Sequence, residues 1–274
     1  MKKILLLCDG ENFPSGATRF IRQMRETEPL YVKGLFMDPM DVLDMIPVGF
    51  IPYSGPYQQL KQAEKQMFRK SQDQFVEAFK DAGIKYEIYP HVGEWNRELF
   101  VRESRFADLV VISEELFSAN TMEVQPNFYM IEALRASESP VVVVPENFSQ
   151  IDHLAFAYDG GKESMFAIKQ FTYLFPNLTD LPSEFVHIKD EAADNIPERA
   201  LLGEFTFSHF EAQQTSKLHF DPKKYLTSWL GTKKNVFLVS GSFSRSAVSN
   251  VFRKSFADHV IAEHSCPIFI AHFS

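Results

Sequence analysis

Two Asp-Gly pairs stand where this chain is most able to do chemistry. Asp9-Gly10 follows the apolar run 4–7, and Asp159-Gly160 follows the apolar run 153–157. A carboxylate that ends a strand can contact a bound ligand, or it can make the turn and cap the next helix through its side chain. Both uses are open for Asp9 and for Asp159.

A hydroxyl-rich stretch follows a later apolar run, 236–239. It begins after Gly241, extends from Ser242 to Ser249 and contains Arg245. An arginine beside backbone amides and hydroxyls suits a phosphate, and the same stretch equally suits a helix cap with an exposed arginine.

The histidines do not form a convincing metal site. His259, His264 and Cys266 are the one tight group, and no second cluster completes four ligands. Packing and charge complementarity at a helix end explain this group better than a metal, so no metal is expected.

Four further polar residues fall at the ends of expected strands and could line the same edge of a sheet: His187, His209, Asp190 and Glu211. We assign them no catalytic role, because a role in proton transfer depends on geometry. Hydrolase, Walker-type and dinucleotide glycine motifs are all missing, so we expect no catalytic residue.

The elements that must position these residues are short apolar strands alternating with helices. The long stretch 58–82 places Met67, Phe68 and Phe75 on one helical face and ends at Gly83. A helix is also expected over 127–136. The expected strands are 4–7, 31–37, 84–89, 109–112 and 141–144, then 153–157, 183–188, 205–212, 236–239 and 267–271.

This alternation predicts an α/β fold, and its strands, apolar on both faces, indicate parallel sheets covered by helices on both sides. The two sets of five strands predict two domains, 1–147 and 150–274, packed with pseudo-twofold symmetry. Ligands of such sheets bind beyond the carboxyl ends of the strands, where Asp9 and Asp159 lie. The irregular stretch 38–58 is expected either to pack against the other domain or a second chain, or to form a lid.

Composition narrows the classes of function. The net charge is −8, with 22 acidic against 16 basic residues up to Asn147 and 14 against 12 after it, so nucleic acid and anionic membrane are disfavoured partners. The 27 phenylalanines predict aromatic packing in the cores and between the domains. No run approaches the roughly 20 apolar residues of a membrane span, and a cytoplasmic location is expected.

Three motifs recur in the same order in both domains. They are the Asp-Gly turn after the first strand, an apolar entry to the fourth strand, and Ser139-Pro140 or Cys266-Pro267 before the fifth. In this respect the chain resembles the universal stress protein family in its tandem two-domain form. The resemblance implies two Rossmann-like domains of the adenine nucleotide alpha hydrolase-like type.

ATP-binding members of that family carry a glycine, two residues, a second glycine, nine residues, and a glycine followed by Ser or Thr. On the second domain this motif falls on Gly241, Ser244 and Lys254-Ser255, so its spacing is kept and two of its three glycines are replaced. The resemblance implies nucleotide contacts from Asp159, Gly241, Ser244, Arg245, Ser246, Lys254 and Ser255, and from Asp9 if the first domain binds. The cofactor implied is ATP or another adenine nucleotide in the second domain.

The first domain has Ser113, Glu114 and Glu115 in the corresponding loop. Two carboxylates would repel a triphosphate, so nucleotide binding there is disfavoured. The leading hypothesis is a non-catalytic protein of stress adaptation or regulation, with nucleotide binding weak or lost, a protein partner of unknown identity and a possible homodimer. The alternatives are a protein that binds or slowly hydrolyses ATP through its second domain, and a sensor of a small molecule or metal.

Overall fold

The computed structural model describes residues 1–10, 12–39, 55–90, 93–118, 126–188, 196–218, 229–230, 232–241, 261 and 266–272. The first half of the chain contains β1 (Lys2–Asp9), α1 (Ser15–Arg25), β2 (Leu30–Met37), α2 (Gly55–Asp81), β3 (Lys85–Ile88), α3 (Arg97–Arg105), β4 (Leu109–Ser113), α4 (Phe128–Ala136) and β5 (Val141–Val144). The second half contains β6 (His153–Tyr158), α5 (Lys162–Leu174), the 3-10 turn η2 (Pro176–Leu178), β7 (Ser183–Ile188), α6 (Arg199–His209), β8 (Gln213–Leu218), β9 (Val236–Gly241) and β10 (Ile268–Ala271).

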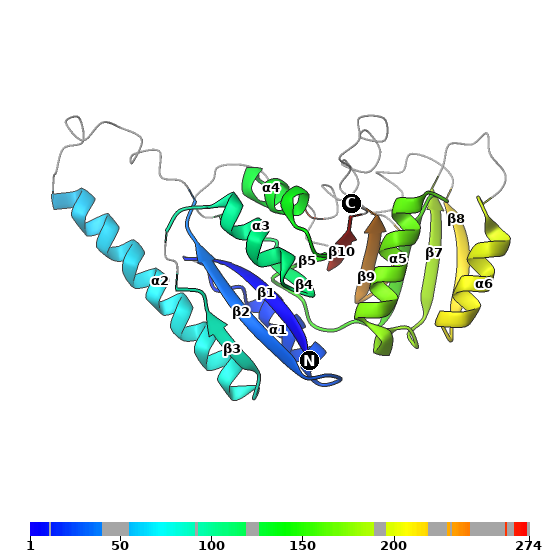
Figure 1. The fold of residues 1–274 in the computed structure, drawn as a ribbon, viewed down its shortest axis with the longest axis horizontal. Coiled ribbons are helices and arrows are strands. Elements are labelled where there is room, and N and C mark those ends of the chain that lie inside the picture. Colours follow the sequence, from blue (N-terminus) through cyan, green and yellow to red (C-terminus); the bar gives the residue numbers. More distant parts are fainter. Residues whose placement is uncertain are drawn as a thin grey trace.

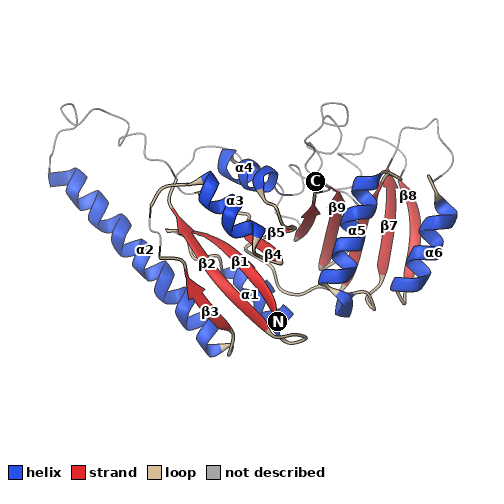
Figure 2. Cartoon of the chain, viewed as in Figure 1, coloured by secondary structure: helices blue, strands red, loops and turns tan. Residues whose placement is uncertain are grey.

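All ten described strands belong to one sheet, in the order β3-β2-β1-β4-β5-β10-β9-β6-β7-β8 (Figures 1 and 2). Neighbouring strands are parallel except β5 and β10, which pair antiparallel. The mostly parallel α/β fold expected from the sequence is therefore confirmed. Counted inward from either edge of the sheet, the strands follow the same order within their half of the chain, as a duplicated domain would give. The domain boundaries 1–147 and 150–274 stay a prediction.

The strand registers show which residues of the two halves correspond. Val142 faces Phe269 at the middle of the antiparallel pair, so symmetry about this pair exchanges Val141 with Ile268. Following the parallel pairings outward, Leu5 of β1 corresponds to Ala155 of β6. Counting along the strands then places Asp9 on Asp159 and Ser113 on Gly241, as the motif comparison expected.

Helices cover both faces of the sheet. One core cluster packs α1, α2, α5 and α6 against one face, and a second packs α3 and α4 against the other. Phe20 of α1 joins the halves: its ring centroid lies 6.2 Å from that of Phe175 and 5.6 Å from that of Phe237, both in the second half. The prediction of aromatic packing between the halves is therefore confirmed.

The connection between the halves is also held in place. Phe148 and Ile151 are buried, and the Arg19 Nε of α1 donates to the Phe148 carbonyl oxygen at 2.8 Å. Gly16 packs so closely on Pro145 and Glu146 that a side-chain Cβ there would lie 2.1 Å from the Pro145 oxygen. The link is part of the packed interface.

The strand expected over 205–212 is wrong, because α6 covers Arg199–His209 and β8 begins at Gln213. The alternation of Phe205 and Phe207 suggested a strand, but Phe207 is 85% exposed. The buried residues Leu202, Thr206 and Phe210 instead recur at helical spacing. The strand β8 is polar and lies at a sheet edge, so it carries no apolar signal.

The helix expected over 58–82 is confirmed as α2, and Gly83 ends it with a left-handed φ of 61°. Its buried face is shorter than expected: Phe68, Ser71, Phe75 and Phe79 are buried, whereas Met67 is 41% exposed. Figure 1 shows the first turns of α2 lying beyond the sheet, where no strand is beside them. Residues 40–54, which include most of the irregular stretch, lie outside the described residues.

Each half has an ion pair at the same place on its second strand, with the charges exchanged. In the first half Lys33 of β2 contacts Glu103 of α3 at 2.8 Å, and its Nζ lies 4.7 Å from the centre of the Tyr89 ring. In the second half Glu184 of β7, which the registers place on Lys33, contacts Lys233.

The two lysines are held alike, because the Lys233 Nζ lies 4.8 Å from the centre of the Trp229 ring. Burial alone would raise the pKa of Glu184, but hydrogen bonds from Lys233 and Ser216 together with the Lys233 charge hold it below its ordinary value of 4.5.

We predict that Phe269→Ala lowers the free energy of unfolding by about 3–5 kcal/mol, because the Phe269 ring is fully buried beside the strand pair that joins the halves. Its ring centroid lies 5.6 Å from that of Phe171. Urea unfolding measures the change. Phe207→Ala is the control and should change stability by less than about 0.5 kcal/mol, since Phe207 is exposed. Equal losses in the two variants would contradict the packing described.

A second prediction concerns pH. Because the folded-state pKa of Glu184 lies below its unfolded value, its ionisation stabilises the fold above about pH 4.5 and this contribution is lost as pH falls through the folded pKa. Glu184→Gln should therefore be less stable than the parent near pH 7, and the difference should shrink below about pH 4.5. Thermal unfolding across that range tests this, and a difference independent of pH would refute it.

Candidate functional site

The first candidate position is the carboxyl end of β1 and β4, here called the first mouth, around Asp9. Asp9 is buried, and its Oδ1 accepts a hydrogen bond from the Asn12 backbone N–H at 2.5 Å. Its Oδ2 accepts from the Phe117 backbone N–H at 2.9 Å. The carboxylate therefore makes the turn after β1 and ties it to the loop after β4, which is the structural one of its two possible uses.

Phe117, whose backbone N–H contacts Asp9, is one of the buried residues of this loop. Its φ of 57° is left-handed, which is uncommon for a residue with a side chain and costs on the order of 1 kcal/mol or more. The ring is fully buried, 4.9 Å from the Tyr129 ring and 6.3 Å from the Trp95 ring between centroids. Burial of this ring in an aromatic cluster offsets the backbone strain.

The long helix α2 contributes a side chain that packs over Gly10. A Cβ on Gly10 would lie 2.2 Å from a ring carbon of Phe68 and 2.5 Å from a carboxylate oxygen of Asp38. Glycine is needed at position 10 because these side chains approach its backbone so closely. The space that the turn leaves over Gly10 is occupied by the protein itself.

Glu114 and Glu115 differ in the structure from the repelling pair that the sequence suggested. Glu114 is buried, and its Oε1 accepts from the Glu146 backbone N–H at 2.8 Å. It therefore anchors the loop to the chain after β5, and only Glu115 is half-buried at the surface.

The backbone amides that the structure describes in the first part of this loop, from Glu114 to Ser118, all have acceptors within the protein. The N–H groups of Glu114 to Ser118 donate, in order, to the Val144 oxygen, the Ser113 Oγ, the Ser113 oxygen, the Asp9 Oδ2 and the Glu115 oxygen. A phosphate-binding loop works by offering such amides to an anion. In the first half they are already engaged.

The second mouth is the carboxyl end of β6 and β9, around Asp159, and its aspartate is exposed where Asp9 is buried. The Asp159 Oδ1 accepts from the Gly161 backbone N–H at 2.9 Å and from the Ser164 Oγ at 2.7 Å. Gly160 between them has a φ of 79°. Asp159 thus makes the turn that starts α5, and it does so at the surface.

Gly241 lies against the first turn of α5. A Cβ at this position would lie 2.8 Å from the Ser164 nitrogen and from the Glu163 carbonyl atoms. The structure therefore brings two of the predicted site residues, Asp159 and Gly241, to the same helix start, where Ser164 contacts the Asp159 side chain and abuts Gly241. A helix start beside a glycine suits an anion.

The other predicted contacts lie outside the described residues: Ser244, Arg245, Ser246, Lys254 and Ser255, with His259, His264 and Asp190. The prediction that His209 and Glu211 line the second mouth is wrong. His209 ends α6, and the Glu211 backbone N–H donates to the Thr179 oxygen, before β7 begins and so at the opposite end of the strands. The prediction failed because α6 was expected to be a strand. His187 does lie at the end of β7, buried, with its Nδ1 2.9 Å from the Tyr158 oxygen.

Sequence reasoning missed the role of Phe117. The registers align Ser113 with Gly241, and counting onward in the sequence from this pair aligns Phe117 with Arg245. A large apolar residue in place of a potential phosphate donor was visible in the sequence. It signals that one loop is packed into the core.

Solved structures of similar shape cover nearly the whole chain. A universal stress protein from Archaeoglobus fulgidus matches with a TM-score of 0.73 and 13% identity over 99% of this chain and 96% of its own. The chain has the universal stress protein fold. A putative universal stress protein from Pseudomonas aeruginosa matches with a TM-score of 0.59 and 9% identity over 99% and 93% of the two chains. A functionally unknown protein from the same species matches with a TM-score of 0.61 and 10% identity, over 99% of this chain and 92% of its own.

Sequence comparison adds nothing to this likeness: no protein-family model matches the chain, and no curated protein matches it. Within the described ranges, no group of three or more His, Cys, Asp or Glu residues could hold a metal ion. A search of the described helices for one long and apolar enough to cross a membrane also finds none. The universal stress protein fold therefore rests on the sheet topology and its structural relatives.

We predict that Gly241→Ala lowers the free energy of unfolding by about 1–3 kcal/mol, because its Cβ would press on the backbone of α5. Gly203→Ala is the matched control: a Cβ there meets nothing within 4 Å, so alanine in α6 should add about 0.5–1 kcal/mol. Urea titration of the two variants measures the expected loss of stability in Gly241→Ala and the expected gain in Gly203→Ala. A neutral or stabilising Gly241→Ala would show that the close approach is not needed.

Proposed function

We propose that the chain is a tandem universal stress protein that acts by binding and not by catalysis. In this proposal its one adenine-nucleotide site, a weakened one, is in the second half, and its role is regulatory, through recognition of a protein partner. The fold likeness over 99% of the chain supports the family, and the symmetric strand order supports the tandem form.

The observation that carries the proposal is the set of engaged amides from Glu114 to Ser118. A triphosphate would have to break these hydrogen bonds and displace the buried Phe117 ring. The phosphate would accept from the released amides, but the buried oxygens that accept them now, such as the Val144 oxygen and the Asp9 Oδ2, would each lose a donor at about 1–3 kcal/mol, which closes the first mouth to nucleotide in this proposal.

The second mouth has the opposite character. Asp159 is exposed, and Gly241 leaves the start of α5 free of side-chain bulk. By resemblance the remaining contacts come from Ser244, Arg245, Ser246, Lys254 and Ser255. Only the first of the three motif glycines is kept, so we propose weak binding without turnover.

Equilibrium dialysis of the full chain against labelled ATP tests this proposal. We expect no more than one ATP per chain, loss of that binding in Asp159→Ala, and no phosphate release above a protein-free control. Circular dichroism checks that the variant folds, since removing a turn-forming aspartate costs only about 1 kcal/mol.

Glu115→Gln is the matched variant in the first half. It removes the surface carboxylate and leaves the amide hydrogen bonds intact, so the stoichiometry should stay at one. Two ATP per chain in this variant would mean that charge, and not the engaged amides, closes the first mouth. Binding that survives Asp159→Ala would remove the second mouth from the proposal.

A further inference from the structure

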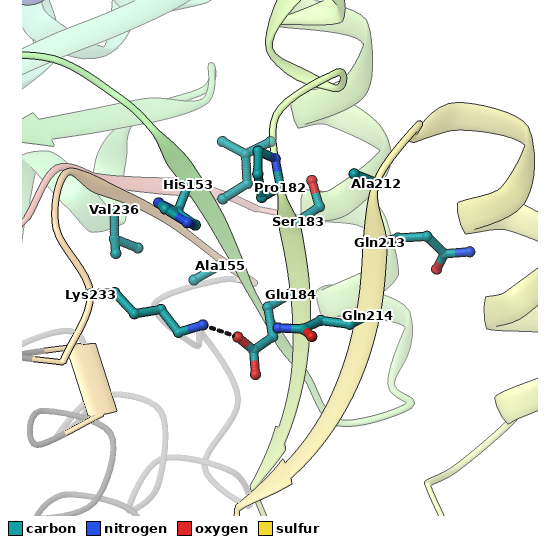
Figure 3. A pocket seen from close by; sticks show the side chains of 11 residues that line it. His153, Ala155, Pro182, Ser183, Glu184, Ala212, Gln213, Gln214, Lys233 and Val236 are labelled. Atoms are coloured by element: carbon teal, nitrogen blue, oxygen red, sulfur yellow. Dashed lines mark hydrogen bonds and ion pairs between the residues drawn. The ribbon is translucent and has the colours of Figure 1, made fainter.

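The second half contains a cavity that is unrelated to the second mouth. Its volume is about 330 Å³, and it lies where β6, β7 and β8 begin, next to Lys233 and Val236 (Figure 3). Asp159 and Gly241 lie at the far ends of their strands. The volume falls at the lower end of small-molecule sites, which span about 300–1,000 Å³.

The cavity lies on the sheet face that α5 and α6 leave uncovered. Ala155 and Val236, which line it, belong to the core cluster of that opposite face, while Phe156 and Phe185 pack with α5 and α6. Side chains alternate along a strand, so Glu184 also points to the cavity side. Figure 3 shows the Glu184 carboxylate and the Lys233 Nζ meeting beside it.

One substitution between the halves accounts for part of the space. Ala155 corresponds to Leu5, which is fully buried in the first half. The leucine side chain fills the equivalent position beneath α3, and alanine does not. At the neighbouring position Lys33 of the first half corresponds to Glu184 of the second. The side chains around the cavity therefore differ from their counterparts in the first half in both volume and charge.

The cavity presents one fixed charge of each sign. Glu184 is 6% exposed and paired with Lys233, whose ammonium lies over the Trp229 ring. An ammonium has three donors and a carboxylate about four acceptor positions. After the pair has formed, Lys233 still has protons to donate, and Glu184, which also accepts from Ser216 and Gln214, still has an acceptor position.

His153 supplies a third polar group. Its Nδ1 is buried and has no hydrogen-bond partner within the part of the chain that the structure describes. Because this atom is closed to a water-sized molecule, His153 contributes its ring to the cavity wall, and no ligand contact is assigned to its Nδ1. Figure 3 shows the His153 ring and Lys233 on either side of Ala155, so the polar groups surround an apolar floor.

From these observations we propose that the cavity binds a small zwitterion, an amino acid with an aliphatic side chain. Its ammonium contacts Glu184, its carboxylate contacts Lys233, and its side chain lies over Ala155 and Val236. The wall charges sum to zero, so the cavity does not attract a polyanion such as a nucleotide. This site goes beyond the proposed function and does not depend on it.

Calorimetric titration of the full chain with three matched probes tests the proposal. The probes are L-leucine, isoamylamine, which lacks the carboxylate, and 4-methylpentanoate, which lacks the ammonium. Loss of one charge-assisted contact should weaken binding by about 10- to 100-fold, so leucine should bind more tightly than either analogue by that factor. L-alanine and L-valine then measure the contribution of the apolar floor.

Ala155→Leu places the first half's residue in the cavity and should abolish leucine binding while the chain stays folded. Lys233→Met tests the charge separately and should weaken binding by about 10- to 100-fold if Ala155→Leu does not fold. Asp159→Ala, at the opposite end of the strand, should leave leucine binding unchanged. The proposal fails if the parent protein binds no leucine, if both analogues bind as well as leucine, or if Ala155→Leu binds it normally.

Discussion

The antiparallel pairing of β5 with β10 is the contact on which the rest of this structure depends. Each half is a parallel sheet with an apolar edge strand, which is β5 with its four valines in the first half and β10 with Ile-Phe-Ile in the second. Without a partner strand, such an edge can pair with other chains and cause aggregation. Pairing the two edges closes both at once and fixes the halves in opposite orientation. The phenylalanines around Phe20 then pack on one face of the sheet, and the connecting segment packs with them through Phe148.

Corresponding positions in the two halves have different surroundings and contacts, although the strand order is symmetric. The aspartate after the first strand accepts two hydrogen bonds in each half, but it is buried in the first half and exposed in the second. The loop after the fourth strand is sealed by Phe117 in one half and begins with Gly241 in the other. The ion pair on the second strand is kept with its charges exchanged, and the leucine of one half is an alanine in the other. A shared backbone therefore supports different chemistry in each half.

Much of the fold could be predicted from the sequence, because apolar strands and the Asp-Gly turns are local signals. Val141 to Val144 and the left-handed Gly83 are examples, and both are where the pattern placed them. The sequence failed where burial depends on distant partners: Phe207 alternates like a strand residue and faces solvent, and Met67 follows the helical period beyond the sheet. The candidate site shows the same limit. Asp9 and Asp159 are the same residue type in the same turn, yet Asp9 is buried and accepts from the Phe117 amide, more than a hundred residues away, whereas Asp159 is exposed.

The place of β10 after the other described strands of the second half has a consequence for biosynthesis. Its residues 268–271 are the only described partner of the outer edge of β5, so this edge stays open until the second half has left the ribosome. The first half can form its sheet early, yet it carries four consecutive valines on an unpaired strand throughout synthesis of the second half. Nascent chains crowded on one message therefore share an open strand edge that can pair between neighbours.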